Sequence, residues 1–146
     1  MKEPAGLDPR QLEALRHRVE RSAFHNWVGL QMHDLGDGRA ELRLELQPQH
    51  FNAQGMVHGG IITVLADTCI GLALRSKLRS GLTHRTAQLN VHFLQKGEGD
   101  RLVGVGNCLH SGQRMGYGEA EIHDGAGNMI ARAVATFVIL PAPGAF

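Results

Sequence analysis

The sequence lacks the signatures of several large catalytic classes. None of its serines lies in a GxSxG nucleophile elbow, and it contains no Walker A motif, no complete GxGxxG motif and no HExxH motif. These absences remove the main sequence support for α/β-hydrolase, nucleotide-driven, nicotinamide-dependent and zinc-protease chemistry. The nine histidines show no metal-ligand spacing. Away from His50 and His58 we interpret them as surface or strand residues, and we expect neither a metal nor a cofactor.

The chain also lacks an excess of charge of either sign. Its 15 Lys and Arg residues face 14 Asp and Glu residues, and the basic residues never form a run of five or six. A nucleic acid or an anionic membrane surface needs a concentrated basic patch. We therefore expect neither as a partner, and any anionic partner must be small and locally bound.

Cysteines and long apolar runs are scarce as well. The two cysteines, Cys69 and Cys108, lack CxxC spacing, which predicts free thiols in a reducing compartment and hence a cytoplasmic protein. Residues 1–10 contain no apolar segment of a signal peptide, and no run of about 18 uninterrupted apolar residues occurs. We expect neither export nor a membrane span.

What is present suits one domain with its own core. The 146 residues are 42% hydrophobic, enough to fold without a metal or a disulfide. The 19 glycines are about twice the usual frequency, and we expect them in turns or where backbones approach closely.

The hydrophobic pattern predicts an α+β fold. Asp8, Pro9 and Gln11 have the form of a capping box, so residues 1–23 are interpreted as a tail and a helix packed on a domain of residues 24–146. The pattern then predicts strands over 24–35 and 39–46, a helix over 57–77, and strands over 86–94, 101–109, 114–123 and 129–140. Because the turns between the last four strands are short and contain glycine, we expect these strands to form an antiparallel meander.

The helix predicted over residues 57–77 is apolar on nearly every side, which is typical of a buried helix. A single sheet of about six strands can cover it only by curling around it. One flank of the helix and one sheet edge would stay exposed, so we expect at least a homodimer.

The glycine pair Gly59-Gly60 opens this helix. Glycines leave the first backbone N–H groups unobstructed at the positive end of the helix dipole, which suits an oxyanion or anion site. The alternative is that the pair only permits a tight junction between loop and helix.

Asp67 lies two turns into the same helix. A carboxylate among apolar residues costs several kcal/mol unless it is paired or acts on a ligand. Burial would raise the pKa of Asp67 and suit it as a general base, whereas a neighbouring Thr or Arg could instead simply satisfy it. Gly59 and Asp67 are about 12 Å apart along a helix, so both can act on one bond only if they come from different chains.

The spacing of Asn52, Gly55, His58-Gly59-Gly60 and Asp67, together with the later segment 89–94, resembles the hotdog-fold acyl-CoA thioesterases of the PaaI-like, phenylacetate-degradation branch. The resemblance covers about residues 24–140. It implies a long central helix wrapped by a curled antiparallel sheet, two such units joined into one continuous sheet, and active sites at their interface.

The resemblance also implies roles for individual residues. Asp67 matches the catalytic acid, which activates water or attacks directly. Gly59 matches the backbone N–H that polarises the thioester oxygen, and Asn52 and His58 match residues that position the thioester and support that polarisation.

Further positions follow from the same resemblance. Thr86 matches a hydroxyl residue that helps hold the water, although its neighbour Thr83 leaves the register open. Gly60, Thr68 and Arg114 are expected to contact substrate or CoA, with Arg114 at the phosphates. The alternative for Arg114 is a solvated arginine in a turn.

The sequence thus predicts an acyl-CoA thioesterase that acts on a phenylacetyl-type substrate and assembles into a homotetramer. One alternative is a non-catalytic module that binds or senses acyl-CoA. The other is a hotdog enoyl-CoA hydratase, which is disfavoured because no Asp is followed five positions later by His.

Overall fold

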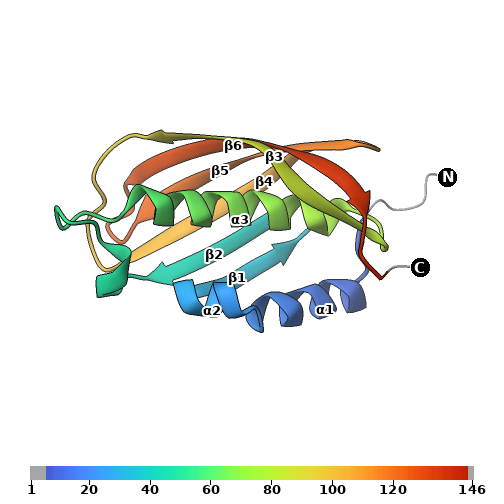
Figure 1. Cartoon of the computed structure of the whole chain (residues 1–146), viewed down its shortest axis with the longest axis horizontal. Coiled ribbons are helices and arrows are strands. Elements are labelled where there is room, and N and C mark those ends of the chain that lie inside the picture. Colours follow the sequence, from blue (N-terminus) through green and yellow to red (C-terminus); the bar gives the residue numbers. More distant parts are fainter. Residues whose placement is uncertain (1–5, 145–146) are drawn as a thin grey trace.

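Six antiparallel strands form one sheet that curves around a long helix (Figure 1). The computed structural model describes residues 6–144. In chain order the elements are α1 (Pro9–Glu20), α2 (Ala23–Val28), β1 (Leu30–Gly36), β2 (Arg39–Glu45), a short 3-10 helix (Pro48–His50), α3 (Gly59–Lys77), β3 (Leu82–Phe93), β4 (Arg101–Ser111), β5 (Met115–Asp124) and β6 (Met129–Pro141). The predicted central helix, the six strands and the additional N-terminal helix are confirmed.

The N-terminal segment contains two helices. The capping box is present, because the Asp8 carboxylate accepts from Gln11 N and the Gln11 side chain accepts from Asp8 N, each at 2.9 Å. The strand predicted over residues 24–35 is wrong in its first half. Ser22 caps the separate helix α2, which Gly29 ends at φ 93° before β1 begins.

Helix α3 lies in the concave side of the sheet. Its residues Leu65, Ala66, Cys69, Ile70 and Leu74 are fully buried. By length and composition α3 could span a membrane, but these apolar side chains pack against the sheet and form its core. Burial on every side is not observed in the single chain, because one face of α3 remains partly exposed.

The strand order is β1-β2-β4-β5-β6-β3, so the predicted four-stranded meander is wrong. Strands β4, β5 and β6 are consecutive neighbours, but β3 pairs with β6 and forms an edge of the sheet. The glycine-containing segment after β3 is not a hairpin. It crosses the ends of the neighbouring strands, where Leu94 N donates to Ile130 O and Glu98 N donates to the buried Asp124 carboxylate, both at 2.8 Å.

Part of the glycine excess allows α3 to lie close to the sheet. A methyl group on Gly106 of β4 would lie 2.4 Å from the backbone of Cys69, and one on Gly118 of β5 would lie 2.7 Å from the Ile70 side chain. The expectation of close backbone approach is confirmed at these two strand positions, where any larger residue would push α3 away.

Candidate active site

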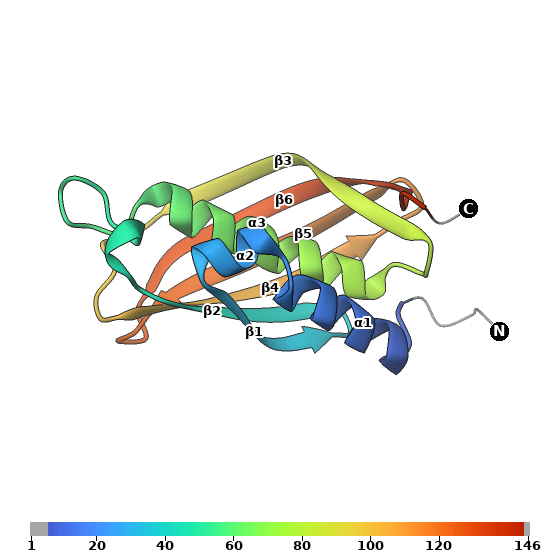
Figure 2. The same ribbon diagram turned by 60° about the horizontal axis from the view of Figure 1, so that its bottom comes forward.

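Strand β3 runs beside α3 and brings two predicted site residues into contact. The Thr86 hydroxyl donates to Asp67 Oδ1 at 2.8 Å. Towards the start of α3, a methyl group placed on Gly59 would lie 3.4 Å from Phe93 Cε1. The inner face of β3 therefore borders both the N-terminus and the middle of α3, and both views of the fold show this arrangement (Figures 1 and 2).

A β-bulge turns Thr86 towards α3. The pairing of β3 with β6 shifts register between Thr86 and Gln88, so Ala87 is the extra residue. Thr86 lies opposite the fully buried Phe137, which places it on the inner face of the sheet. Without the bulge, strict alternation from Leu89 would place Thr86 on the opposite, outer face of the sheet. His84 also lies on the inner face, so the adjacent Thr83 points outward and Thr86 is the hydroxyl beside Asp67.

Asp67 is half-buried in the single chain rather than enclosed. Within residues 6–144, Oδ1 accepts from Thr86 and Oδ2 has no hydrogen-bond partner. The expected free-energy cost of burying this carboxylate therefore arises only when another molecule covers Asp67. As arranged, the carboxylate is oriented by one hydroxyl and keeps an oxygen free to accept a proton.

The start of α3 offers one backbone donor rather than two. His58 is the N-cap, and its Nδ1 accepts from Gly60 N at 2.8 Å. The Gly60 N–H is thus occupied, which argues against the predicted substrate contact through this group. In the described part of the chain the Gly59 N–H has no acceptor, and it lies at the positive end of the helix dipole.

Asn52 organises the loop that precedes α3. Its Oδ1 accepts from Gln54 N at 2.9 Å and from Met56 N at 3.1 Å. The turn also needs Gly55, whose φ of 78° is strained for other residues. The Asn52 side-chain oxygen is therefore committed to the geometry of the loop that leads to His58 and Gly59.

His50 is a positioning residue for which the sequence carried no signal. It is only 1% exposed, its Nδ1 accepts from Gln47 N at 2.9 Å, and its Nε2 donates to Val28 O at 2.6 Å. Its backbone oxygen accepts from His58 N at 2.8 Å. This buried imidazole ties the loop before α3 to the end of α2.

His84 is a second histidine of interest, and it is a strand residue as predicted. Its ring meets Phe137 edge-on with centroids 4.9 Å apart, and a methyl group on Gly71 would lie 2.9 Å from its Cε1. Its Nδ1 is buried without a hydrogen-bond partner in the described residues. Burial, aided by the positive charge of Arg75, lowers the pKa of His84 and favours the neutral ring.

The remaining predicted residues are not drawn together around Asp67. Thr68 follows it on α3 and is half-buried, whereas Arg114 is exposed in the turn before β5. Cys69 is buried on the other side of α3, and burial raises the pKa of its thiol to about 12, which excludes it as a nucleophile at neutral pH. Both cysteines are free, as expected.

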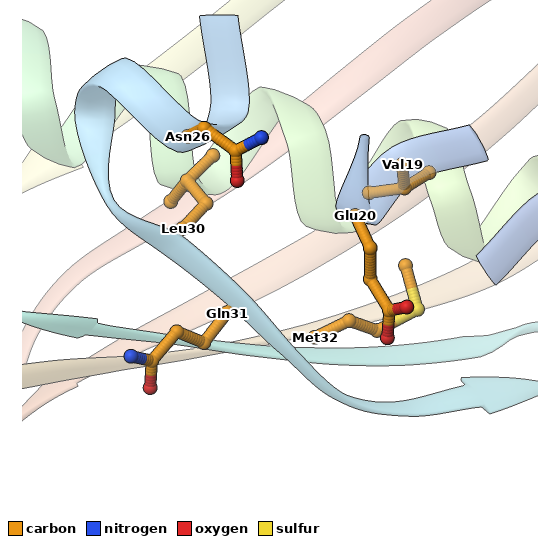
Figure 3. Close-up of a pocket in the computed structure, with 6 residues that line it drawn as sticks. All are labelled: Val19, Glu20, Asn26, Leu30, Gln31 and Met32. Carbon is orange, nitrogen blue, oxygen red and sulfur yellow. The ribbon is translucent and has the colours of Figure 1, made fainter. Parts of the chain in front are cut away.

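A separate cavity of about 300 Å³ lies between α1, α2 and β1 (Figure 3). It is lined by Val19, Glu20, Asn26, Leu30, Gln31 and Met32. None of the predicted site residues belongs to it. The candidate site is instead the open strip between α3 and the edge strand β3.

The long helix wrapped by a six-stranded antiparallel sheet is the hotdog fold. The chain belongs to the thioesterase superfamily, whose family model matches residues 54–131. A protein of Halobacterium salinarum that is named as an esterase is 32% identical over 80% of this chain and 81% of its own length. The medium/long-chain acyl-CoA thioesterase YigI of Salmonella typhimurium is 28% identical over 83% of this chain and 88% of its own.

Solved structures agree with this assignment. The BH2602 protein of Bacillus halodurans, solved with CoA, has a TM-score of 0.77 and 28% identity over 89% of this chain and 88% of its own. The PaaI protein of Escherichia coli, from the phenylacetic acid degradation operon, has a TM-score of 0.81 and 23% identity over 89% of this chain and 93% of its own. At that identity PaaI supports the fold alone.

Proposed function

We propose that this protein hydrolyses an acyl-CoA thioester to a free acid and CoA. The observation that carries the proposal is the hydrogen bond from Thr86 to Asp67, on the strip between α3 and β3. Membership of the thioesterase superfamily and the similarity to YigI support thioester hydrolysis as the class of reaction. The CoA bound to BH2602 supports CoA as the carrier.

In the proposed reaction Asp67 acts as general base. Its free oxygen takes a proton from a water molecule held by the Thr86 hydroxyl, and the water oxygen bonds to the thioester carbon. The Gly59 N–H stabilises the negative charge that develops on the carbonyl oxygen. When the carbon–sulfur bond breaks, the proton on Asp67 neutralises the departing thiolate. Direct attack by Asp67, with later hydrolysis of the anhydride, is the alternative route.

The reaction needs a second chain. Gly59 is the first residue of α3, and Asp67 lies further along the same helix. The two residues are about 12 Å apart along the helix axis, so one chain cannot bring both to a single carbonyl. Edge strand β3 and the half-exposed face of α3 both favour a partner. We propose a homodimer at minimum, with Asp67 of one protomer facing Gly59 of the other, and further pairing into a homotetramer. A cytoplasmic location belongs to the same proposal.

For the acyl group we propose an aromatic, phenylacetyl-type substrate. The motif resemblance points to it, and Phe93, which is 55% exposed beside Gly59, offers a ring against which an aromatic acyl group can pack. The medium/long-chain activity that YigI is named for provides the competing substrate class.

A panel of acyl-CoAs tests the proposal. Phenylacetyl-CoA, hydroxylated phenylacetyl-CoAs, saturated acyl-CoAs of medium and long chain, and an enoyl-CoA are incubated with the purified protein and a thiol reagent. Thiol release that is lost in Asp67→Asn supports the thioesterase. Loss of enoyl absorbance without thiol release would instead identify a hydratase, and binding without any reaction would identify a sensing module. Either of these outcomes overturns the proposal.

A further inference from the structure

Two arginines line one cavity at the end of α3 opposite its N-terminus. This cavity, of about 200 Å³, is lined by residues of α1, the last turns of α3 and the connection to β3. Figure 2 shows α1 near that end of α3. Its lining residues are Leu7, Gln11, Ala14, Leu15, Arg18, Arg75 and Ser80. Its lining combines apolar residues with two arginines, a glutamine and a serine.

Across the residues that the structure describes, neither arginine has a carboxylate partner of the kind that three arginines of the sheet have. Arg39 pairs with Asp34 at 2.7 Å, Arg43 pairs with Glu41 at 3.0 Å, and Arg132 pairs with Glu119 at 3.0 Å. Among residues 6–144, Arg18 and Arg75 take part in no ion pair, and Arg75 makes only a long contact of 3.5 Å with Leu78 O.

The two positive charges oppose each other. Arg75 is half-buried, and burial followed by the charge of Arg18 lowers the pKa of its guanidinium group. Arg18 is exposed, so water screens part of the repulsion between the two guanidinium groups, and an anion bound between them would relieve the rest. A local loss of stability of this kind is typical of binding sites.

The other polar groups fit an acceptor-rich ligand. The Gln11 side-chain oxygen already accepts from Asp8 N, so its amide N–H groups remain as donors, and Ser80 is an exposed residue that carries a hydroxyl. Guanidinium forks match the geometry of phosphate oxygens. The volume suits a phosphate or diphosphate group and is too small for a polymer.

We propose that Arg18 and Arg75, supported by Gln11 and Ser80, bind a phosphate group of a small ligand. The phosphate has two sources. It belongs to the CoA of the substrate if the proposed thioesterase function holds, because Arg75 lies about 12 Å beyond Asp67 along α3. It otherwise belongs to a free phosphorylated effector.

The experiment titrates adenosine 3′,5′-bisphosphate and inorganic pyrophosphate into the full-length protein by calorimetry and by thermal shift. The variants are Arg18→Gln, Arg75→Gln and the double variant. Arg10→Gln is the matched control, because Arg10 is an exposed arginine of α1 that does not line the cavity. We expect saturable binding by wild type and control, with affinity at least about tenfold weaker in each single variant, as for one lost charged hydrogen bond.

A second readout separates binding from a structural role. Without ligand, Arg18→Gln should melt at the same temperature as wild type or higher, because like-charge repulsion is removed, yet it should lose the stabilisation by ligand. A raised KM for acyl-CoA in these variants identifies CoA as the source of the phosphate, and an unchanged KM identifies a free effector.

Equal binding by the double variant and the control, or no saturable binding to wild type, overturns the phosphate site. Both titrations require no turnover, so their result is independent of whether the protein hydrolyses acyl-CoA.

Discussion

The Thr86 hydroxyl donates a 2.8 Å hydrogen bond to Asp67 Oδ1 and thereby joins the edge strand β3 to the middle of α3. The bond fixes the orientation of the Asp67 carboxylate and therefore the position of its other oxygen, Oδ2. Because Thr86 still has oxygen lone pairs to offer, the pair can hold a water molecule between a hydroxyl and a base. The first prediction tests this relationship.

Thr86→Val should lower kcat by about 10- to 100-fold, as expected for the loss of a hydrogen bond to a charged group. Thr83→Val is the matched control, since it makes the same chemical change three residues earlier on the outer face. Steady-state kinetics of both variants provide the measurement. Equal effects at the two positions would show that the bond to Asp67 has no special role.

Gly59→Ala should leave the fold intact and reduce kcat by about 10²-fold or more. The added methyl group would make an ordinary 3.4 Å contact with Phe93, and alanine favours a helix, so the melting temperature should not fall. The methyl group nevertheless stands beside the N–H that is proposed to bind the carbonyl oxygen.

The double variant Gly59→Ala/Phe93→Ala, compared with Phe93→Ala alone, serves as its control. Removal of the ring gives the methyl group room, so equal kcat values of these two variants would mean that Gly59→Ala acts only by displacing Phe93. A kcat of the double variant that stays about 10²-fold below that of Phe93→Ala supports the role of the Gly59 N–H.

Most of the architecture could be predicted because it depends on local pattern. The capping box at Asp8, the apolar run of α3 and the alternation of β2 are visible in sequence, and all three elements form. The position of β3 in the strand order was not visible in the sequence. Its position beside β6 depends on the segment after β3 crossing the sheet end to Asp124, and a glycine-rich crossing has the same composition as a hairpin turn.

The site could be predicted only in part for a similar reason. Gly59 and Asp67 stand out through motif spacing, but the orientation of Thr86 depends on the bulge at Ala87, which reverses the alternation of β3. His50 and His84 act through packing partners that are distant in sequence. Hydrogen bonds between distant segments leave no periodic signal.

Asp124→Asn should lower the free energy of unfolding by about 2 kcal/mol at pH 7, because the carboxylate accepts hydrogen bonds from Glu98, Ala126 and Asn128. Burial opposes ionisation of Asp124, but these bonds outweigh it and hold the pKa of Asp124 below its ordinary value. An unfolded Asp has a pKa of about 3.9. The stabilisation is therefore complete above about pH 4 and is lost as the pH falls through the lower native pKa.

Urea denaturation of wild type and Asp124→Asn from pH 7 to pH 3 measures this effect. The difference between the two proteins should be constant near neutrality and narrow at the acid end. Asp37→Asn is the control, because its carboxylate is 98% exposed in a surface ion pair with Lys77 and should contribute little at any pH. A difference that widens in acid would contradict the hydrogen-bonded carboxylate.

Co-expression of two inactive variants should restore activity. In a homodimer of Asp67→Asn and Gly59→Val chains, one site carries both changes and the other carries neither, provided that each site takes Asp67 from one protomer and Gly59 from its partner. Random assembly after co-expression makes half of the dimers mixed, with one intact site each, so about a quarter of wild-type activity should return. If each site were built within a single chain, every site in the mixture would contain one damaging change. If the co-expressed pair is no more active than the separate variants, the two-chain site is refuted. The contact between Asp67 and Thr86 within one chain would not be affected by that result.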